Sequence, residues 1–259
     1  MSDRTGPAPS PLDGWTLWRV FARSLFLQAA WNPQGMQNLG LAYALFPALR
    51  RLYPDPEVQA AAVRRHLAFF NTQPYMAAAI LGGVLFHEER IARGEEKPEQ
   101  VVGFKAALMG PLAALGDGFF WLSLRPALGA FCAALVPLLQ GWAAVLFLLL
   151  YNAVHLFLRA RLFRMGLTLG DRLVEALARA QLPTWGTRLR AVGAGSAGGA
   201  AAYLAISLGQ NNGGPAGCAL EAGYLALGAI AYWLASRRFR NYALLYLAAL
   251  VAVAAGALL

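Results

Sequence analysis

The chain has 259 residues, of which 58% are hydrophobic and only 14% are charged, and its formal net charge is +9. Soluble domains carry about a quarter charged residues, so this composition favours a membrane protein over a pair of soluble domains. Nearly all of the basic residues are arginines beside apolar segments. That is how membrane topology signals are arranged, whereas a basic stripe with interleaved aromatic residues would indicate nucleic-acid binding. We therefore expect no nucleic-acid partner.

The N-terminal region alternates between polar and amphipathic segments. Residues 1–14 are polar and rich in proline, which predicts a disordered tail without the apolar core of a cleaved signal peptide. Residues 15–30 mix apolar positions with arginines and predict an amphipathic helix near the membrane surface. Pro33 and Gly35 then interrupt regular structure. A short apolar helix follows and ends at the Pro-Asp-Pro turn at residues 54–56.

A polar break, Asn-Thr-Gln-Pro at residues 71–74, follows the next predicted helix, at residues 57–70. Proline biases the residue before it away from helical geometry. Residues 75–86 are apolar but too few to cross a hydrocarbon core of about 30 Å, for which a helix needs roughly 20 residues. We therefore predict a re-entrant arm, which a membrane protein tolerates where other protein covers the broken backbone.

Longer apolar segments begin near residue 101. Residues 101–124 are interrupted by glycines, a proline and Asp117, and they must cross the membrane once if the later spans are to alternate. Residues 126–158 give the strongest spanning signal, with Pro137 as a candidate kink. Residues 159–190 carry seven arginines against two acidic residues. The positive-inside rule therefore predicts a cytoplasmic loop there.

The C-terminal part continues the alternation, with predicted spans at residues 191–208, 218–235 and 242–259 and a far-side loop at 209–217. Together these patterns predict an all-α fold, a polytopic membrane helical bundle with one domain over residues 15–259. Its parts are an amphipathic and re-entrant core at residues 15–125 and transmembrane helices at residues 126–259.

Asp117 is the first candidate binding residue. A carboxylate at the centre of a lipid-facing helix costs about 2.5–3.5 kcal/mol, and the glycines around it would let a helix break, as at the solute sites of many transporters. In one interpretation Asp117 binds a hydroxylated solute. In the other it caps a helix or pairs with Lys105 or Arg125.

Two further clusters are candidates for contacting a sugar. Asn71 and Gln73 carry amides, which both donate and accept hydrogen bonds and so suit sugar hydroxyls, and the nearby aromatic residues would supply a flat apolar surface. The alternative is that Asn71 terminates two short helices. Trp31 and Asn32 form a weaker pair, for which breaking a helix is the simpler explanation.

Catalytic and metal sites are not indicated. His66, His87 and His155 are scattered, and the sequence contains no zinc-protease, nucleophile-elbow, P-loop or kinase motif. Cys132 and Cys218 lack the spacing of a metal or redox pair. We expect no catalytic residue, no metal and no cofactor.

Three ordered motifs carry a resemblance over residues 15–160: "MQNLGLAYALFPALRRLY", "RRHLAFFNTQPYMAAAILGG" and "GFKAALMGPLAALGDGFFWLSLRPALGAF". They are similar to the IID membrane subunit of mannose-family sugar phosphotransferase systems. The resemblance implies that the chain pairs with a IIC membrane subunit to carry a hexose across the bacterial inner (cytoplasmic) membrane, in contact with membrane lipid. It also implies that IIA and IIB subunits relay phosphate through histidines of their own.

One motif departs from the family. Between Trp-Asn and Met-Gln the family usually has an aromatic residue, an acid and a base, whereas this chain has Pro33, Gln34 and Gly35. This change motivates an alternative, a non-transporting membrane scaffold or regulatory subunit of a phosphotransferase system. An intramembrane hydrolase would need a paired nucleophile and base, which the sequence does not offer.

Overall fold

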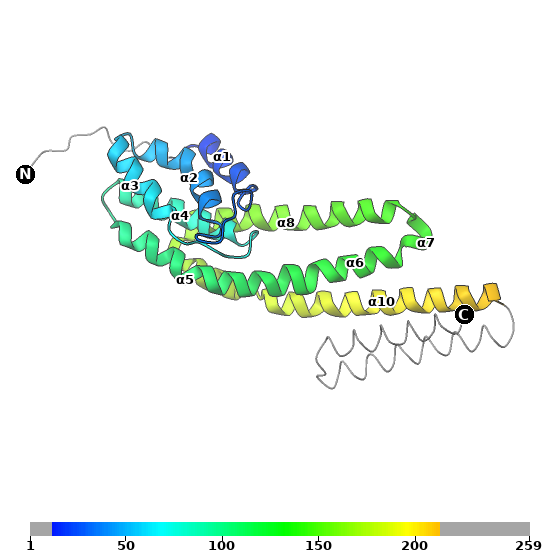
Figure 1. Ribbon diagram of the computed structural model, residues 1–259. Helices are drawn as coiled ribbons and strands as arrows, with labels where there is room; N and C mark the ends of the chain where they lie inside the picture. The colour runs from blue at the N-terminus through cyan, green and yellow to red at the C-terminus, as the bar shows by residue number, and fades with distance from the viewer. Residues whose placement is uncertain (1–11, 213–259) are drawn as a thin grey trace, which may run out of the picture. The chain divides into compact units, whose positions relative to one another are not determined.

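The computed structural model describes residues 12–212, which form helices joined by short connections, as predicted for an all-α protein (Figure 1). Contacts divide this part of the chain into two compact units. One comprises the residues up to 128 together with 144–191, and the other comprises 129–143 and the residues from 192 onward. The helices are α1 (Gly14–Ser24), α2 (Asn38–Leu52), α3 (Pro56–His66), α4 (Ala77–Ala92), α5 (Pro98–Gly116), the π-helix η1 (Asp117–Leu124), α6 (Arg125–Ala134), α7 (Val136–Leu139), α8 (Trp142–Leu169), the 3-10 turn η2 (Gly170–Arg172), α9 (Leu173–Arg179) and α10 (Leu182–Asn212).

Helix α1 is amphipathic, but it ends at Ser24 rather than at residue 30. Its first turn is capped by Asp13, whose side chain accepts a hydrogen bond from the Thr16 N–H at 2.8 Å. Trp15 and Trp18 on one face are exposed, whereas Val20 is fully buried against the core. The exposed tryptophans fit a helix that lies in a membrane interface.

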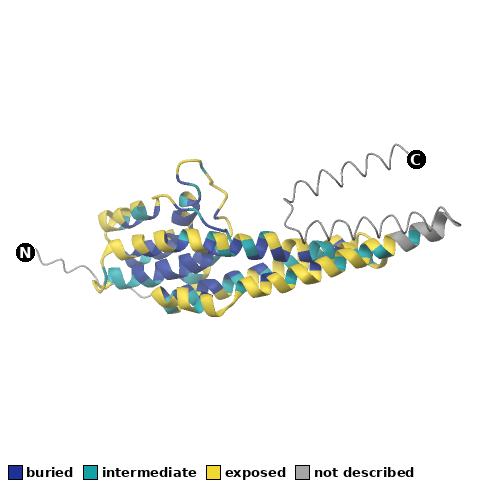
Figure 2. Ribbon diagram, turned by 90° about the horizontal axis from the view of Figure 1, so that it is seen from below, coloured by how far each residue is buried: buried dark blue, intermediate teal, exposed yellow. Residues whose placement is uncertain are grey.

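Helix α4 is the centre of the first unit and is buried along most of its length, as the dark blue segments in Figure 2 show. Two glycines let it contact α8 almost backbone to backbone. A Cβ added at Gly82 would lie 2.1 Å from the Phe163 carbonyl oxygen, and one at Gly166 would lie 2.2 Å from the Ala79 carbonyl oxygen. Small residues permit such close helix contacts in membrane proteins. The re-entrant character of residues 75–86, which lie mostly in α4, stays a prediction.

The segment around Asp117 does not break, contrary to our expectation. Helix α5 passes directly into η1 and then α6, with Asp117 as the first residue of the π-helix. A wider π-helical stretch absorbs irregularity without ending the helix. The neighbouring glycine has a packing role instead, because a Cβ at Gly116 would lie 2.7 Å from the side chain of Gln73.

The apolar stretch at residues 126–158 is interrupted at Pro137, the candidate kink, by a turn instead of a bend within one helix. Helix α6 ends at Ala134, and α8 begins at Trp142. The short α7 between them contains Pro137 and ends at Gln140, whose φ is +49°. Hydropathy alone does not detect this interruption, because the residues that form it are themselves mostly apolar.

Residues 159–190, which we described as a loop, are largely helical. Helix α8 continues to Leu169 and α10 begins at Leu182, with η2 and α9 between them. The predicted span at 191–208 is helical and extends to Asn212. The predicted spans at 218–235 and 242–259, and most of the predicted loop at 209–217, lie outside the described residues.

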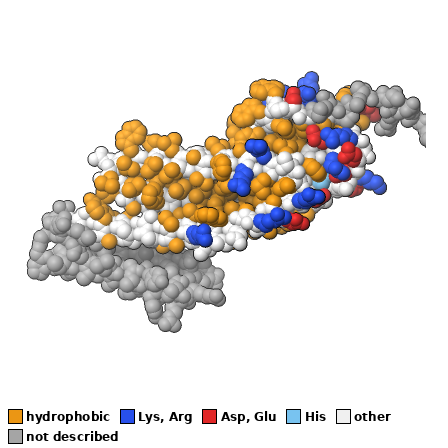
Figure 3. All heavy atoms as spheres, turned by 180° about the vertical axis from the view of Figure 1, so that it is seen from behind, with side chains coloured by type: hydrophobic (Ala, Val, Ile, Leu, Met, Phe, Trp, Pro, Cys, Tyr) orange, Lys and Arg blue, Asp and Glu red, His pale blue; other side chains and the backbone are white. Residues whose placement is uncertain are grey.

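Within residues 12–212, two helical stretches are long and apolar enough to cross a membrane, Pro98–Ala134 and Trp142–Leu204. Large side chains on α8 face outward, including Leu148, Leu149 and Phe157, each more than half exposed. In Figure 3, hydrophobic side chains cover a broad face of the molecule, whereas acidic and basic side chains gather at one end. An apolar face of this kind suits contact with lipid.

Candidate functional site

Two loops that were separate candidates in the sequence lie side by side in the first unit. Met36 forms a β-bridge with Asn32 and a second bridge with Phe70. The Gln37 N–H donates to the Phe70 carbonyl oxygen at 2.8 Å, and the Phe70 N–H donates to the Gly35 carbonyl oxygen at 3.2 Å. The Trp-Asn loop and the Asn-Thr-Gln-Pro loop therefore form one joined platform, which we call the two-loop platform (residues 31–37 and 70–75).

A buried amide ties the two loops together. The Gln37 side chain donates from Nε2 to the Thr72 carbonyl oxygen at 2.8 Å and accepts from the Thr72 N–H at 3.1 Å. It thus satisfies both backbone groups of Thr72, as a neighbouring strand would. The Thr72 hydroxyl donates to the Met109 carbonyl oxygen at 3.0 Å, which links the platform to α5. We did not select Gln37 from the sequence, although it is an amide in an apolar stretch, like Gln73.

The side-chain amide of Gln73 has a hydrogen-bonded oxygen and an unpaired nitrogen within the described structure. Its Oε1 accepts hydrogen bonds from the backbone N–H groups of Tyr75 and Met76, at 2.8 and 2.9 Å, and so supports the start of α4. Its Nε2 is buried and has no partner among the described residues. Asn71 is half-buried, and its side chain makes no hydrogen bond to a described residue. The hydrogen bonds that precede α4 therefore come from Gln73 and not from Asn71.

The amide of Asn32 holds the first loop in shape. Its Oδ1 accepts from the Gly35 N–H at 2.7 Å, and its Nδ2 donates to Asn38 Oδ1 at 3.0 Å. Asn38 in turn donates to the Leu67 carbonyl oxygen at 2.6 Å. Trp31 next to it is 52% exposed. The geometry gives Asn32 a structural role in the loop and leaves the indole of Trp31 accessible.

Asp117 is exposed and makes no hydrogen bond or ion pair with any residue between 12 and 212. Neither alternative partner is in place, because Lys105 donates to the Arg65 carbonyl oxygen and the Arg125 guanidinium lies 5.9 Å from the Trp121 ring centre. Asp117 directly follows Gly116, which packs against Gln73. Asp117 therefore follows in sequence the glycine that packs against the two-loop platform, and its own side chain is exposed.

Aromatic rings surround Tyr75 at the end of the platform. The His155 ring stacks on Tyr75 at a centroid distance of 4.4 Å and an angle of 18°, and Phe120 contacts it edge-on at 4.8 Å. The Tyr151 hydroxyl donates to the Tyr75 hydroxyl at 3.3 Å. His155 Nε2 is bonded to Asn152 Oδ1, whereas its buried Nδ1 has no partner among the described residues. The spacing of Tyr151 and His155, one helical turn apart on α8, was the signal that sequence reasoning missed.

Two buried polar atoms near Tyr75 lower the stability of the described structure because they lack hydrogen-bond partners in it. A buried polar atom without a hydrogen bond costs about 1–3 kcal/mol. Gln73 Nε2 and His155 Nδ1 both lack partners within the described part of the chain, and Tyr75 contacts both residues. A hydroxyl group, which donates and accepts, would satisfy groups of this kind.

A buried charge network joins α3, α4 and α5 with Tyr53, the residue that follows α2. The Glu88 carboxylate, fully buried, accepts hydrogen bonds from Arg65 Nε at 2.8 Å, from His66 Nε2 at 2.8 Å and from the Tyr53 hydroxyl at 2.6 Å. Lys105 Nζ lies 3.2 Å from His66 Nδ1. With Lys105 as donor to Nδ1, a neutral His66 places its proton on Nε2, toward Glu88.

The pKa values of this network follow from burial and from these contacts. Burial alone would raise the pKa of Glu88, but the hydrogen bonds from His66 and Arg65 lower it to about 2. Burial lowers the pKa of His66 more than the contact with Glu88 raises it, and the positive charges of Lys105 and Arg65 act in the same direction as burial. The network therefore contains an ionised Glu88 and a neutral His66, which supports our assignment of His66 as a structural residue.

The other histidine near this end is also held in polar contacts, since His87 Nδ1 lies 2.7 Å from Glu96 Oε2. Among residues 12–212, no group of three or more His, Cys, Asp or Glu side chains is arranged to hold a metal ion.

The apolar helices around a polar two-loop platform define an all-helical membrane protein. Residues 12–207 match the family described as the PTS system mannose/fructose/sorbose family IID component, and the chain belongs to this family. The resemblance inferred from the three motifs is thus confirmed.

Relatives and solved structures agree with this assignment. The chain is 45% identical over 142 residues to the PTS system mannose-specific EIID component of Escherichia coli K12, covering 54% of this chain and 50% of that protein. It is 38% identical over 165 residues to the sorbose-specific EIID component of Lacticaseibacillus casei, covering 62% and 58%. The chain spans about half the length of the curated relatives it matches. A cryo-EM structure of the mannose transporter ManYZ with microcin E492 contains a chain with 29% identity and a TM-score of 0.60, covering 95% of this chain and 97% of that chain. A second structure, described as a membrane protein, gives 38% identity and a TM-score of 0.65, covering 71% and 68%.

Proposed function

We propose that this chain is the IID membrane subunit of a mannose-family phosphotransferase system and forms, with a IIC subunit, the unit that translocates a hexose. Two findings support this: the family match over residues 12–207 and the likeness to a chain of the mannose transporter structure. The protein is a multi-pass component of the bacterial inner (cytoplasmic) membrane. Residues 15–259 form its one membrane domain, and the arginine-rich residues 159–190 lie on the cytoplasmic side. The predicted tail does not extend to residue 14, because Asp13 caps α1 and Gly14 begins it, and residues 1–11 lie outside the described residues.

The observation that carries the sugar-binding role is the two-loop platform. It brings Asn71 and Gln73 close to the Trp31 loop, and it leaves the Gln73 Nε2 buried without a partner in the described structure. In this proposal the amides of Asn71 and Gln73 bind sugar hydroxyls. Asp117 accepts from a hydroxyl at the edge of the platform, and Trp31 and Asn32 complete the site from the neighbouring loop.

The chemistry of phosphoryl transfer takes place on other subunits. IIA and IIB carry the phosphate, and IIB traps the sugar as its phosphate at the cytoplasmic face after the IIC–IID unit has alternated access. The buried positions of His66 and His87 support this division, because both are at most 1% exposed and are bonded to carboxylates. A histidine in such a position does not present its ring to a phosphocarrier protein.

A second function, a non-transporting scaffold or regulatory subunit, is favoured by one specific feature. At Gly35 a Cβ would lie 2.0 Å from Asn38 Nδ2, so the Asn38 amide fills the space that a side chain would need. The acid and the base that the family usually has in this loop are replaced by Gln34 and Gly35. The Asn38 amide therefore occupies the space that a side chain at position 35 would take. A binding site that depended on the acid and the base of the family's loop would differ in this chain.

The experiment that separates the two functions is uptake of a panel of labelled hexoses in a deletion strain, with and without the restored gene. Restored, phosphoenolpyruvate-dependent accumulation of one sugar phosphate supports transport and names the substrate. Uptake that survives the deletion, together with altered expression of other sugar genes, supports the regulatory function. The double variant Pro33→Ala and Gln34→Ala, assayed in parallel, tests whether this loop contributes.

A further inference from the structure

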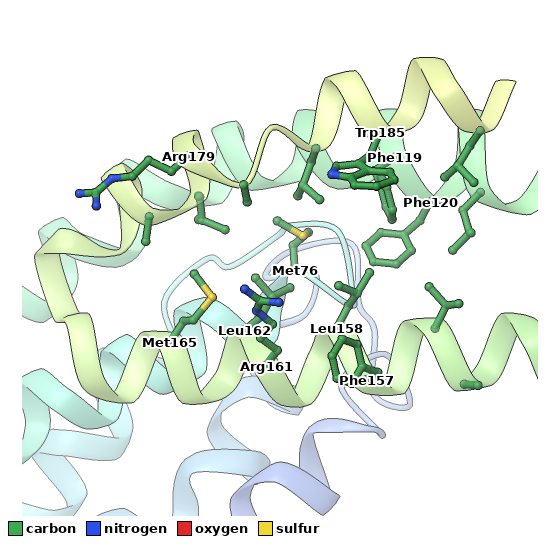
Figure 4. Close-up of a pocket in the computed structure, with 18 residues that line it drawn as sticks. Met76, Phe119, Phe120, Phe157, Leu158, Arg161, Leu162, Met165, Arg179 and Trp185 are labelled. Carbon is green, nitrogen blue, oxygen red and sulfur yellow. The ribbon is translucent and has the colours of Figure 1, made fainter. Parts of the chain in front are cut away.

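A cavity lies in the first unit, between α8, α9, the start of α10 and η1. Its volume is about 830 Å³, and its lining is overwhelmingly apolar. Pockets of roughly 300–1,000 Å³ are the usual size for binding a small molecule. The aromatic side chains of Phe119, Phe120 and Trp185 gather at one end (Figure 4). The cavity is distinct from the two-loop platform, with Met76 and Phe120 as its nearest link to it.

Two arginines break the apolar lining. Arg161 projects from α8 and turns its guanidinium into the cavity, toward Met76 (Figure 4), and Arg179 of α9 lies at the rim. Arg179 has a carboxylate partner, Glu175, at 3.3 Å. Arg161 has no hydrogen bond or ion pair with any described residue. Arg161 is exposed at this cavity, so its guanidinium is accessible to an anionic ligand.

The surrounding segment supplies no excess of carboxylates. Residues 159–190 contain seven arginines, whereas Asp171 and Glu175 are the acidic residues among them. Asp171 faces His87 at 3.5 Å, and Glu175 pairs with Arg179. The local charge is therefore positive, which favours an anionic ligand at Arg161. Basic pockets between membrane helices are typical binding sites for anionic lipid head groups.

We propose that this cavity binds an anionic phospholipid of the membrane. The phosphate pairs with the Arg161 guanidinium, whose fork of donors matches phosphate oxygens. An acyl chain follows the apolar wall past Leu158 toward Phe120 and Trp185. The observations that select this occupant are the cationic end, the apolar length beyond it and the position of the cavity between the two helical stretches that are able to cross a membrane.

The test uses the full chain in the membrane complex in which it is made, purified in mild detergent and stripped of weakly bound lipid. Native mass spectrometry and thermal unfolding are recorded with added phosphatidylglycerol, cardiolipin or phosphatidylethanolamine, and with inorganic phosphate alone. The variant is Arg161→Gln. Its matched control is Arg164→Gln, which removes an exposed arginine three residues further along the same helix and outside the cavity. A third variant, Ala176→Phe, fills the cavity without changing its charge.

We expect the unsubstituted protein and Arg164→Gln to bind phosphatidylglycerol or cardiolipin and to be stabilised by it. Arg161→Gln should bind on the order of tenfold more weakly, as the loss of one charge-assisted pair predicts, and Ala176→Phe should also lose the lipid. Equal binding by Arg161→Gln and Arg164→Gln would overturn the proposal. Equal stabilisation by phosphatidylethanolamine, or full stabilisation by inorganic phosphate alone, would also overturn it. A photo-crosslinking residue placed at position 157 of the cavity lining gives a further check, and a crosslink to a protein chain instead of lipid would overturn the proposal as well.

Discussion

Replacing Glu88 by Gln tests the buried charge network most directly. The Glu88 carboxylate accepts from Arg65, His66 and Tyr53, and the Arg65 side chain is only 13% exposed. Glu88→Gln keeps the size of the side chain but leaves the Arg65 charge without its carboxylate. Removing one partner of a buried ion pair costs about 3–5 kcal/mol. A protein of this size loses roughly 2–4 °C of melting temperature per kcal/mol, so we expect a fall of roughly 10 °C.

The assay is thermal unfolding of the purified protein in detergent, followed by intrinsic tryptophan fluorescence. The matched control is Glu57→Gln, because Glu57 is exposed on α3 and makes no ion pair with a described residue. The control should melt within about 2 °C of the unsubstituted protein, as surface substitutions usually do. If Glu88→Gln melted at the same temperature as Glu57→Gln, the network would not hold α3, α4 and α5 together, and our reasoning on its energetics would be wrong.

Three further predictions follow from other parts of the structure. Acidification should destabilise the protein in two steps, measured as melting temperature against pH. Stability falls below about pH 6.5, because the unfolded chain takes up a proton that neutral His66 does not. It then falls from about pH 4.5 to 2, where Glu88 loses about 3 kcal/mol of stabilisation, and a melting temperature that stayed flat over both ranges would refute this. Asp117→Asn should reduce hexose uptake at least several-fold while membrane insertion stays normal, and unchanged uptake would remove Asp117 from the site. Gly82→Ala should lower the melting temperature by an amount that corresponds to about 1–3 kcal/mol of overpacking, whereas Gly103→Ala, with nothing within 4 Å of its Cβ, should be neutral; equal effects would argue against the close α4–α8 contact.

Local features of the fold were accessible from the sequence. The end of α2 before the Pro-Asp-Pro turn was marked by residues whose own chemistry stops a helix, whereas α3 ends at His66, earlier than the predicted end at residue 70. The positions of α2 and α3 follow from these signals, and Asp55 caps α3 as an aspartate before Pro56 is expected to do. Family membership was likewise visible, because the three motifs are specific and occur in order.

The errors arose where one residue type has two structural uses. Gly116 and Gly118 next to Asp117 suggested a broken helix, but Gly116 is small because Gln73 and Met76 pack against it. Conversely, Pro137 marked a candidate kink in the apolar residues 135–141, but hydropathy does not distinguish a kinked lipid-facing helix from a lipid-facing turn. Whether a helix breaks at a glycine, and whether an apolar segment turns, both depend on the residues that pack against that segment in the fold. A local sequence pattern does not contain this information.

The two-loop platform could not be predicted from the sequence for the same reason, and it explains why a polar break occurs in so apolar a chain. A break exposes backbone groups that lipid cannot satisfy. Here the break at residues 71–74 is covered by a loop that lies 35 positions earlier, through the Gln37 amide at Thr72 and the backbone bonds at Phe70. Gln73 then starts α4 with its oxygen. Because the backbone at Thr72 and Phe70 is satisfied within the protein, the break is stable without a ligand, and the buried amide nitrogen of Gln73 is left without a partner among the described residues.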